Sequence, residues 1–133
     1  MTTDFIFVYG TLRKETATAM HQVLAQYCEY VSVGSMQGKL YDIGHYPGAI
    51  KSTEPSDKVY GELYRILNQE KLFIRLDEYE ECTDTFPRPH EYIREKTTIT
   101  LPESNNIQAW AYIYNYDTSE LIQIKSGDYL VDR

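Results

Sequence analysis

Hydrophobic residues in this chain fall into short runs separated by turn residues, a pattern typical of a β-rich domain. The first run, at residues 4–9, stops at Gly10 and predicts a buried strand. Further runs at residues 36–43, 59–66 and 92–101 predict three more strands. The stretches between them are rich in the glycine, proline and polar residues that end strands.

The strand predicted at residues 107–116 has the clearest alternation of the chain. Small and branched apolar residues occupy every second position, and larger polar or aromatic residues occupy the positions between them. The first face consists of Ile107, Ala109, Ala111 and Ile113, and the second of Gln108, Trp110, Tyr112, Tyr114 and Tyr116. A strand with side chains lining both faces fits a curved or closed sheet that has an interior.

Two segments have helical spacing instead. Residues 17–26 predict a helix with Thr16 as its N-cap, and residues 68–81 predict a second helix with Asn68 as its N-cap. Two helices are too few to cover both faces of a doubly wound sheet. The sequence therefore predicts a single α+β domain over residues 1–133, with a small mixed, barrel-like sheet flanked by helices.

One carboxylate of the second helix falls on its apolar side. At about 100° per residue, Glu80 lies within the arc formed by Leu72, Phe73, Leu76 and Tyr79. Ionising a carboxyl group in an apolar environment is costly, so its pKa rises toward the range useful for proton transfer. In the alternative interpretation, Glu80 lies in a frayed last turn and reaches water or an arginine.

The loop after the first strand reads Tyr9-Gly10-Thr11-Leu12. Because glycine has no side chain, a ligand can approach the backbone closely, and successive backbone N–H groups could hold its carboxylate or an oxyanion there. The helix that follows would add its positive end. The alternative is that Gly10 serves only the turn and that Leu12 returns to the core.

Composition narrows the classes of function. The net charge is −7 and the 13 lysines and arginines are scattered, which argues against a nucleic-acid partner. No stretch is long enough for a membrane helix and the first residues lack a signal peptide, so we expect a cytoplasmic protein in which Cys28 and Cys82 are free thiols. The spacing of His21, His45 and His90 predicts no metal site, and no cofactor is expected.

Six motifs in order along the chain closely resemble the γ-glutamylcyclotransferase-like family. They lie at residues 8–13, 61–64, 76–80, 92–94, 109–114 and 126–129. The resemblance implies a small β-barrel flanked by helices, with a cavity at one end. The Tyr-Gly-Thr-Leu loop resembles the γ-glutamylamine cyclotransferase branch more than the glutathione-related branch, whose loop usually reads Tyr-Gly-Ser-Asn-Leu.

The resemblance also implies roles for particular residues. Glu80 would be the general acid/base, and the loop of Tyr9, Gly10, Thr11 and Leu12 would hold the γ-glutamyl part of a small-molecule substrate. The implied reaction converts a γ-glutamyl amine to 5-oxoproline and a free amine.

Other residues are candidates for binding the substrate. Tyr112, Tyr114 and Tyr129 could position it through their hydroxyl groups, with core packing as the alternative for each. Arg94 could pair with a substrate carboxylate or with Asp77, and both remain open.

Three other functions are compatible with the sequence. The chain could be a binding module that has kept the cavity without turnover, or a protein-interaction domain that works through its acidic surface. It could also remove a γ-glutamyl protecting group from a specialised metabolite. The identity of the amine and the oligomeric state are open.

Overall fold

The computed structural model describes residues 4–10, 19–44, 46–80, 88–103 and 105–129 of the chain. Within these ranges it contains two helices, α1 (Ala19–Tyr27) and α2 (Gln69–Tyr79). The strands are β1 (Phe5–Val8), β2 (Cys28–Asp42), β3 (Pro47–Lys51), β4 (Lys58–Ile66), β5 (Tyr92–Thr100), β6 (Asn106–Tyr114) and β7 (Ile122–Gln123). Among these described helices, none is long and apolar enough to cross a membrane.

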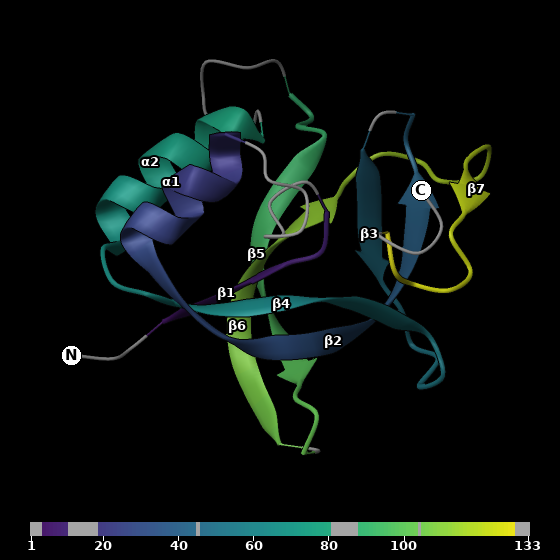
Figure 1. The fold of residues 1–133 in the computed structure, drawn as a ribbon. Coiled ribbons are helices and arrows are strands. Elements are labelled where there is room, and N and C mark those ends of the chain that lie inside the picture. The colour runs from purple at the N-terminus through teal and green to yellow at the C-terminus, as the bar shows by residue number, and fades with distance from the viewer. Residues whose placement is uncertain (1–3, 11–18, 45, 81–87, 104, 130–133) are drawn as a thin grey trace.

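Five of the strands close into a barrel (Figure 1). Their order is β2-β4-β1-β6-β5, and β5 pairs back with β2 to complete the ring. The β1–β6 pairing is parallel, whereas the other pairings of the ring are antiparallel. The predicted α+β fold with a small mixed barrel and two flanking helices is confirmed.

The two faces of β6 line two separate cores, as its alternation predicted. Ala109, Ala111 and Ile113 belong to a buried cluster that contains no helix residue and fills the barrel. Tyr112 and Tyr114 belong to the cluster that packs against α1 and α2. In Figure 1 the two helices lie side by side on one side of the barrel. The second core therefore joins the helices to the outer face of the sheet.

Helix α2 begins where the sequence predicts. The Asn68 side chain accepts a hydrogen bond from the Lys71 backbone N–H at 3.2 Å, so Asn68 is its N-cap. The helix ends at Tyr79, and Glu80 is its C-cap, two residues from the predicted end. Helix α1 starts at Ala19, and the predicted N-cap Thr16 lies outside the described residues.

Two strand predictions were wrong. Strand β2 begins at Cys28 rather than at residue 36, because its first half is largely exposed and lacks a clear apolar alternation. Strand β3 falls in a stretch that we interpreted as a turn, since it starts with Pro47 and Gly48. Glycine is needed there, because a Cβ on Gly48 would lie 2.8 Å from the Tyr114 ring.

Candidate active site

Glu80 lies at one end of the barrel, directly after α2, and is half-buried. Its backbone N–H donates to the Leu76 carbonyl at 2.9 Å, so the last turn of the helix is closed. Leu76 is fully buried, as the helical phase predicted. Glu80 thus lies at the helix end in a closed rather than a frayed turn, and its charge acts on two buried tyrosines, described below.

Tyr9 is the first of these tyrosines and joins three strands. Its hydroxyl donates to the Tyr112 carbonyl at 2.6 Å and accepts from the Ala49 N–H at 3.2 Å. Burial raises the pKa of Tyr9 well above its ordinary value, and the negative charge of Glu80 raises it further. The Tyr9 hydroxyl is therefore neutral and links the end of β1 to β6 and β3.

Tyr92 is the second tyrosine, and its hydroxyl donates to the Pro47 carbonyl at 2.7 Å. Burial raises its pKa, and the neighbouring Tyr9 and Glu80 groups raise it further. Gly10 also packs closely against Pro47, since a Cβ at Gly10 would lie 2.8 Å from the Pro47 ring. The ends of β1, β3 and β5 thus meet here, close enough to Glu80 for its charge to act on both tyrosines.

The remaining residues of the loop, Thr11 and Leu12, lie outside the described residues. The backbone anion site that the sequence predicts at Tyr9–Leu12 therefore stays a prediction. Gly10, which precedes them, is half-buried beside β3.

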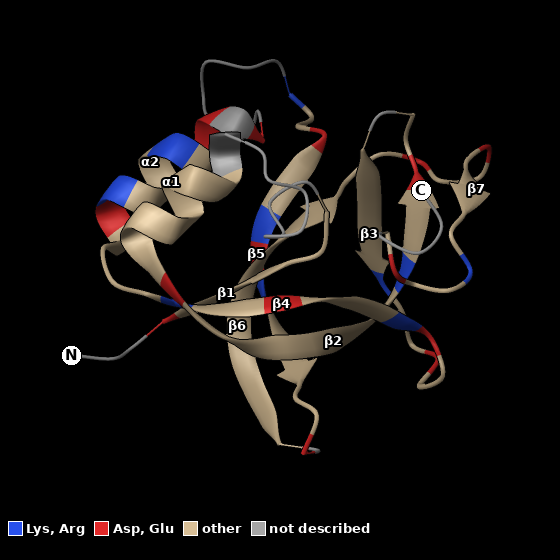
Figure 2. Cartoon of the chain, in the orientation of Figure 1, with Lys and Arg blue, Asp and Glu red and all other residues tan. Residues whose placement is uncertain are grey.

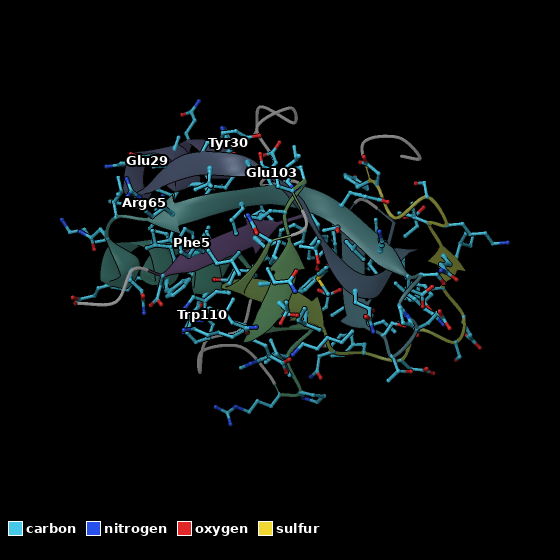
Figure 3. All side chains as sticks on the ribbon, turned by 90° about the horizontal axis from the view of Figure 1, so that it is seen from below. Phe5, Glu29, Tyr30, Arg65, Glu103 and Trp110 are labelled. Atoms are coloured by element: carbon cyan, nitrogen blue, oxygen red, sulfur yellow. The ribbon has the colours of Figure 1, made fainter. Side chains whose placement is uncertain are left out.

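Arg94 and Tyr112 both contact Asp77 on α2. The Tyr112 hydroxyl donates to Asp77 Oδ1 at 2.7 Å, and Arg94 Nη2 lies 3.5 Å from Asp77 Oδ2. The Arg94 guanidinium also stacks on two rings, with its central carbon 3.7 Å from the Phe73 centroid and 5.1 Å from that of Trp110. Figure 3 labels Trp110 on β6. Of the two partners that the sequence left open for Arg94, the structure shows Asp77.

The other two tyrosine candidates lie in different cores. Tyr114 is buried in the core beneath the helices, with its ring centroid 5.6 Å from that of Tyr92. Tyr129 is half-buried and packs against the cluster that fills the barrel. Tyr114 thus adjoins the tyrosines near Glu80, whereas Tyr129 is grouped with the barrel interior.

A buried carboxyl group on β4 was not among the predicted site residues. Glu62 is fully buried and accepts a hydrogen bond from the Tyr64 hydroxyl at 2.9 Å. It pairs with Val8, next to the loop that follows β1, and forms the red segment in the middle of β4 in Figure 2. Its signal in the sequence is a glutamate inside a strand motif, on the same face as Tyr64. Tyr92 was also missed, although it begins a recognised motif.

The arrangement combines one carboxylate with neutral hydroxyl groups. A half-buried carboxylate lies near two tyrosine hydroxyls that remain neutral, in a setting that is largely shielded from water. Within the ranges that the structure describes, no group of three histidine, cysteine, aspartate or glutamate side chains could hold a metal ion. Cys28 is a free, buried thiol, and Cys82 is not among the described residues.

Comparison with known proteins gives a consistent result. Residues 6–131 match the family model described as gamma-glutamyl cyclotransferase, AIG2-like. The chain is 35% identical over 125 residues to the gamma-glutamylcyclotransferase family protein YtfP of Escherichia coli K12, which covers 94% of this chain and 95% of that protein.

Two solved structures have a similar fold. The solution NMR structure of ytfP from Escherichia coli has a TM-score of 0.61 at 32% identity and covers 95% of this chain and 96% of its own. The crystal structure of an AIG2-like protein from Mus musculus has a TM-score of 0.65 at 22% identity, and covers 90% of this chain and 91% of its own. The mouse structure supports the barrel fold alone.

Proposed function

Because this chain belongs to the AIG2-like gamma-glutamyl cyclotransferase family, we propose that it converts a γ-glutamyl amine into 5-oxoproline and the free amine. The observation that carries this proposal is the Glu80 carboxylate beside the buried, neutral hydroxyls of Tyr9 and Tyr92. The form of the loop after β1 supports the γ-glutamylamine branch of the family. The partner is then a small molecule that enters at this end of the barrel.

In the proposed reaction the substrate attacks itself. The α-amine of the γ-glutamyl group forms a bond to its own γ-carbonyl carbon, and the bond from that carbon to the leaving amine breaks. Glu80 accepts the proton that the attacking nitrogen loses and delivers it to the leaving nitrogen, so the carboxylate is regenerated. A positioned acid/base of this kind contributes about 10²–10⁴-fold to the rate.

The surrounding residues would select the reactive shape of the substrate. Ring closure requires the amine and the carbonyl to face each other, and a snug site can hold that conformer. We assign the backbone N–H groups of Gly10, Thr11 and Leu12 to the substrate carboxylate or to the oxyanion that forms at the γ-carbonyl. Tyr9 would form a wall of the site, and Tyr129 remains a candidate contact. Since nucleophile and electrophile belong to one molecule, the chemistry needs no cofactor.

The decisive experiment is to incubate the protein with a panel of γ-glutamyl amines and to follow 5-oxoproline by mass spectrometry. The panel should vary the amine, with γ-glutamyl conjugates of amino acids, of the lysine ε-amine and of simple alkylamines. We expect the wild type to release 5-oxoproline from at least one of them. Glu80→Gln should lower that rate by about 100-fold or more.

Glu78→Gln is a matched control, because it neutralises an exposed carboxylate on the same helix end. It should retain wild-type turnover. Equal activity of the Glu80→Gln variant would refute the role of Glu80. If the wild type releases no product from any conjugate but binds 5-oxoproline tightly, the chain is a binding module rather than an enzyme.

A further inference from the structure

A continuous chain of polar contacts connects α2 with the strands at the active end of the barrel. The Ala49 N–H donates to the Tyr9 hydroxyl, which donates to the Tyr112 carbonyl. The Tyr112 side chain then donates to Asp77 on α2, whose second oxygen faces Arg94 on β5. Tyr112 thus uses its backbone to hold a wall of the site and its side chain to hold the helix.

We propose that Tyr112 and Arg94 act through Asp77 as positioning residues, fixing the last turn of α2 so that the Glu80 carboxylate points into the site. This inference rests on the proposed function. It gives Tyr112 and Arg94 a different role from the substrate contact that the sequence predicts for them.

The place of Asp77 in the helix makes such a restraint effective. Residues three apart on a helix are neighbours on its surface, so Asp77 lies one turn before Glu80 and close to the same side. Glu80 is the C-cap, and its N–H bonds back to the Leu76 carbonyl. A terminal turn has no following turn to hold it and frays easily. Two strand side chains that hold Asp77 restrain this last turn from outside the helix.

Arg94 holds the helix at two successive levels. Its guanidinium faces the Asp77 carboxylate and also lies over the Phe73 ring, one turn earlier in α2. The side chains of Arg94 and Asp77 are only 27% and 21% exposed, so water screens this pair less than a surface ion pair.

Two variants test the network, and a third is the control. Tyr112→Phe removes only the hydroxyl that Asp77 accepts, and Asp77→Asn removes the charge that faces Arg94. The control is Glu29→Gln, because Glu29 pairs with Arg65 across β2 and β4 in the same way (Figure 3). That pair lies at the other end of β1, where Phe5 is opposite Arg65.

Amide hydrogen exchange by NMR reports on the helix end without requiring turnover. We expect the Glu80 amide to exchange roughly tenfold faster in Tyr112→Phe and Asp77→Asn, as expected for loss of a hydrogen bond to a charged group. The amides of β4 should keep their rates in both variants. Glu29→Gln should leave the Glu80 amide unchanged.

Kinetics on the best γ-glutamyl amine provide the second measurement. A positioning role predicts that kcat falls about tenfold in both variants while KM stays within about twofold. A rise in KM with kcat unchanged would overturn the inference in favour of direct substrate binding. Unchanged exchange at Glu80, or exchange that accelerates equally throughout the protein, would overturn it as well. If the wild type makes no 5-oxoproline, the proposed function fails, and the exchange rates alone decide whether the network holds Glu80.

Discussion

Replacing Tyr9 with phenylalanine tests how the strands next to Glu80 are held together. The change keeps the ring but removes the hydroxyl that joins the Ala49 N–H and the Tyr112 carbonyl, both on buried residues. A buried group that loses its partner costs about 1–3 kcal/mol. The Tyr112 carbonyl can still accept through its second lone pair, so we assign its lost hydrogen bond the lower cost of about 1 kcal/mol. For the Ala49 N–H we take the full range of about 1–3 kcal/mol. Tyr9→Phe should therefore lower the free energy of unfolding by about 2–4 kcal/mol.

Urea unfolding measures this loss directly. With an m-value of about 2 kcal/mol per molar, typical for a small domain, the midpoint should fall by about 1–2 M and m should stay constant. Tyr116→Phe is the control, since its hydroxyl donates to the Pro89 carbonyl at 3.0 Å but the residue is 44% exposed. We expect the control to change stability by less than about 0.5 kcal/mol. A similarly small loss for Tyr9→Phe would refute the reasoning.

Three further measurements test the burial of particular groups. The pKa values of Tyr9 and Tyr92 are raised in the folded protein, so their contribution to the free energy of unfolding should be fully retained below about pH 10. Above about pH 10 the free energy of unfolding should fall by about 1.4 kcal/mol per pH unit for each residue. A flat profile in urea titrations from pH 9 to 11 would contradict this. Burial raises the pKa of Cys28 from 9.0 to about 12, so the reactive thiolate is rarer in the folded protein. In a variant that lacks the other cysteine, the reaction of Cys28 with a disulfide reagent at pH 8 should be about 10³-fold slower in the folded than in the denatured protein. Gly127 has φ of 72°, and a Cβ there would lie 1.8 Å from a β4 carbonyl oxygen, so Gly127→Ala should cost about 2 kcal/mol or more in urea unfolding. Gly44 also has a positive φ, of 130°, but a Cβ there would meet nothing within 4 Å, so the same change should cost less.

The sequence predicts elements well where a local pattern determines them. The alternation in β6 predicted that both of its faces are lined, and successive side chains do lie alternately in the barrel interior and against the helices. Strand β3 could not be predicted in this way. Its Pro47 and Gly48 are typical of turns, and they suit a strand only because Gly10 and the Tyr114 ring approach them from distant parts of the chain.

In the candidate site, too, the features set by local sequence were predictable and the contacts between distant elements were not. The helical phase of α2 singled out Glu80, since it depends only on neighbouring residues. The sequence left Asp77 open as a partner of Arg94. The hydrogen bond from Tyr112 to Asp77 was not predicted, because no spacing in the sequence encodes a contact between two distant elements. Glu62 has a visible signal in its strand motif, but only the structure shows that it is fully buried.

The parallel pairing of β1 with β6 has a consequence for how the protein folds. Tyr9 finds its carbonyl partner 103 positions later, so the active end of the barrel is built from both ends of the chain. Contacts so distant in sequence must overcome a large loop-closure entropy, which makes folding slow. During synthesis β1 must wait, with one edge unpaired, until β6 has left the ribosome. Strand β1 is therefore made well before the strand that completes its pairing.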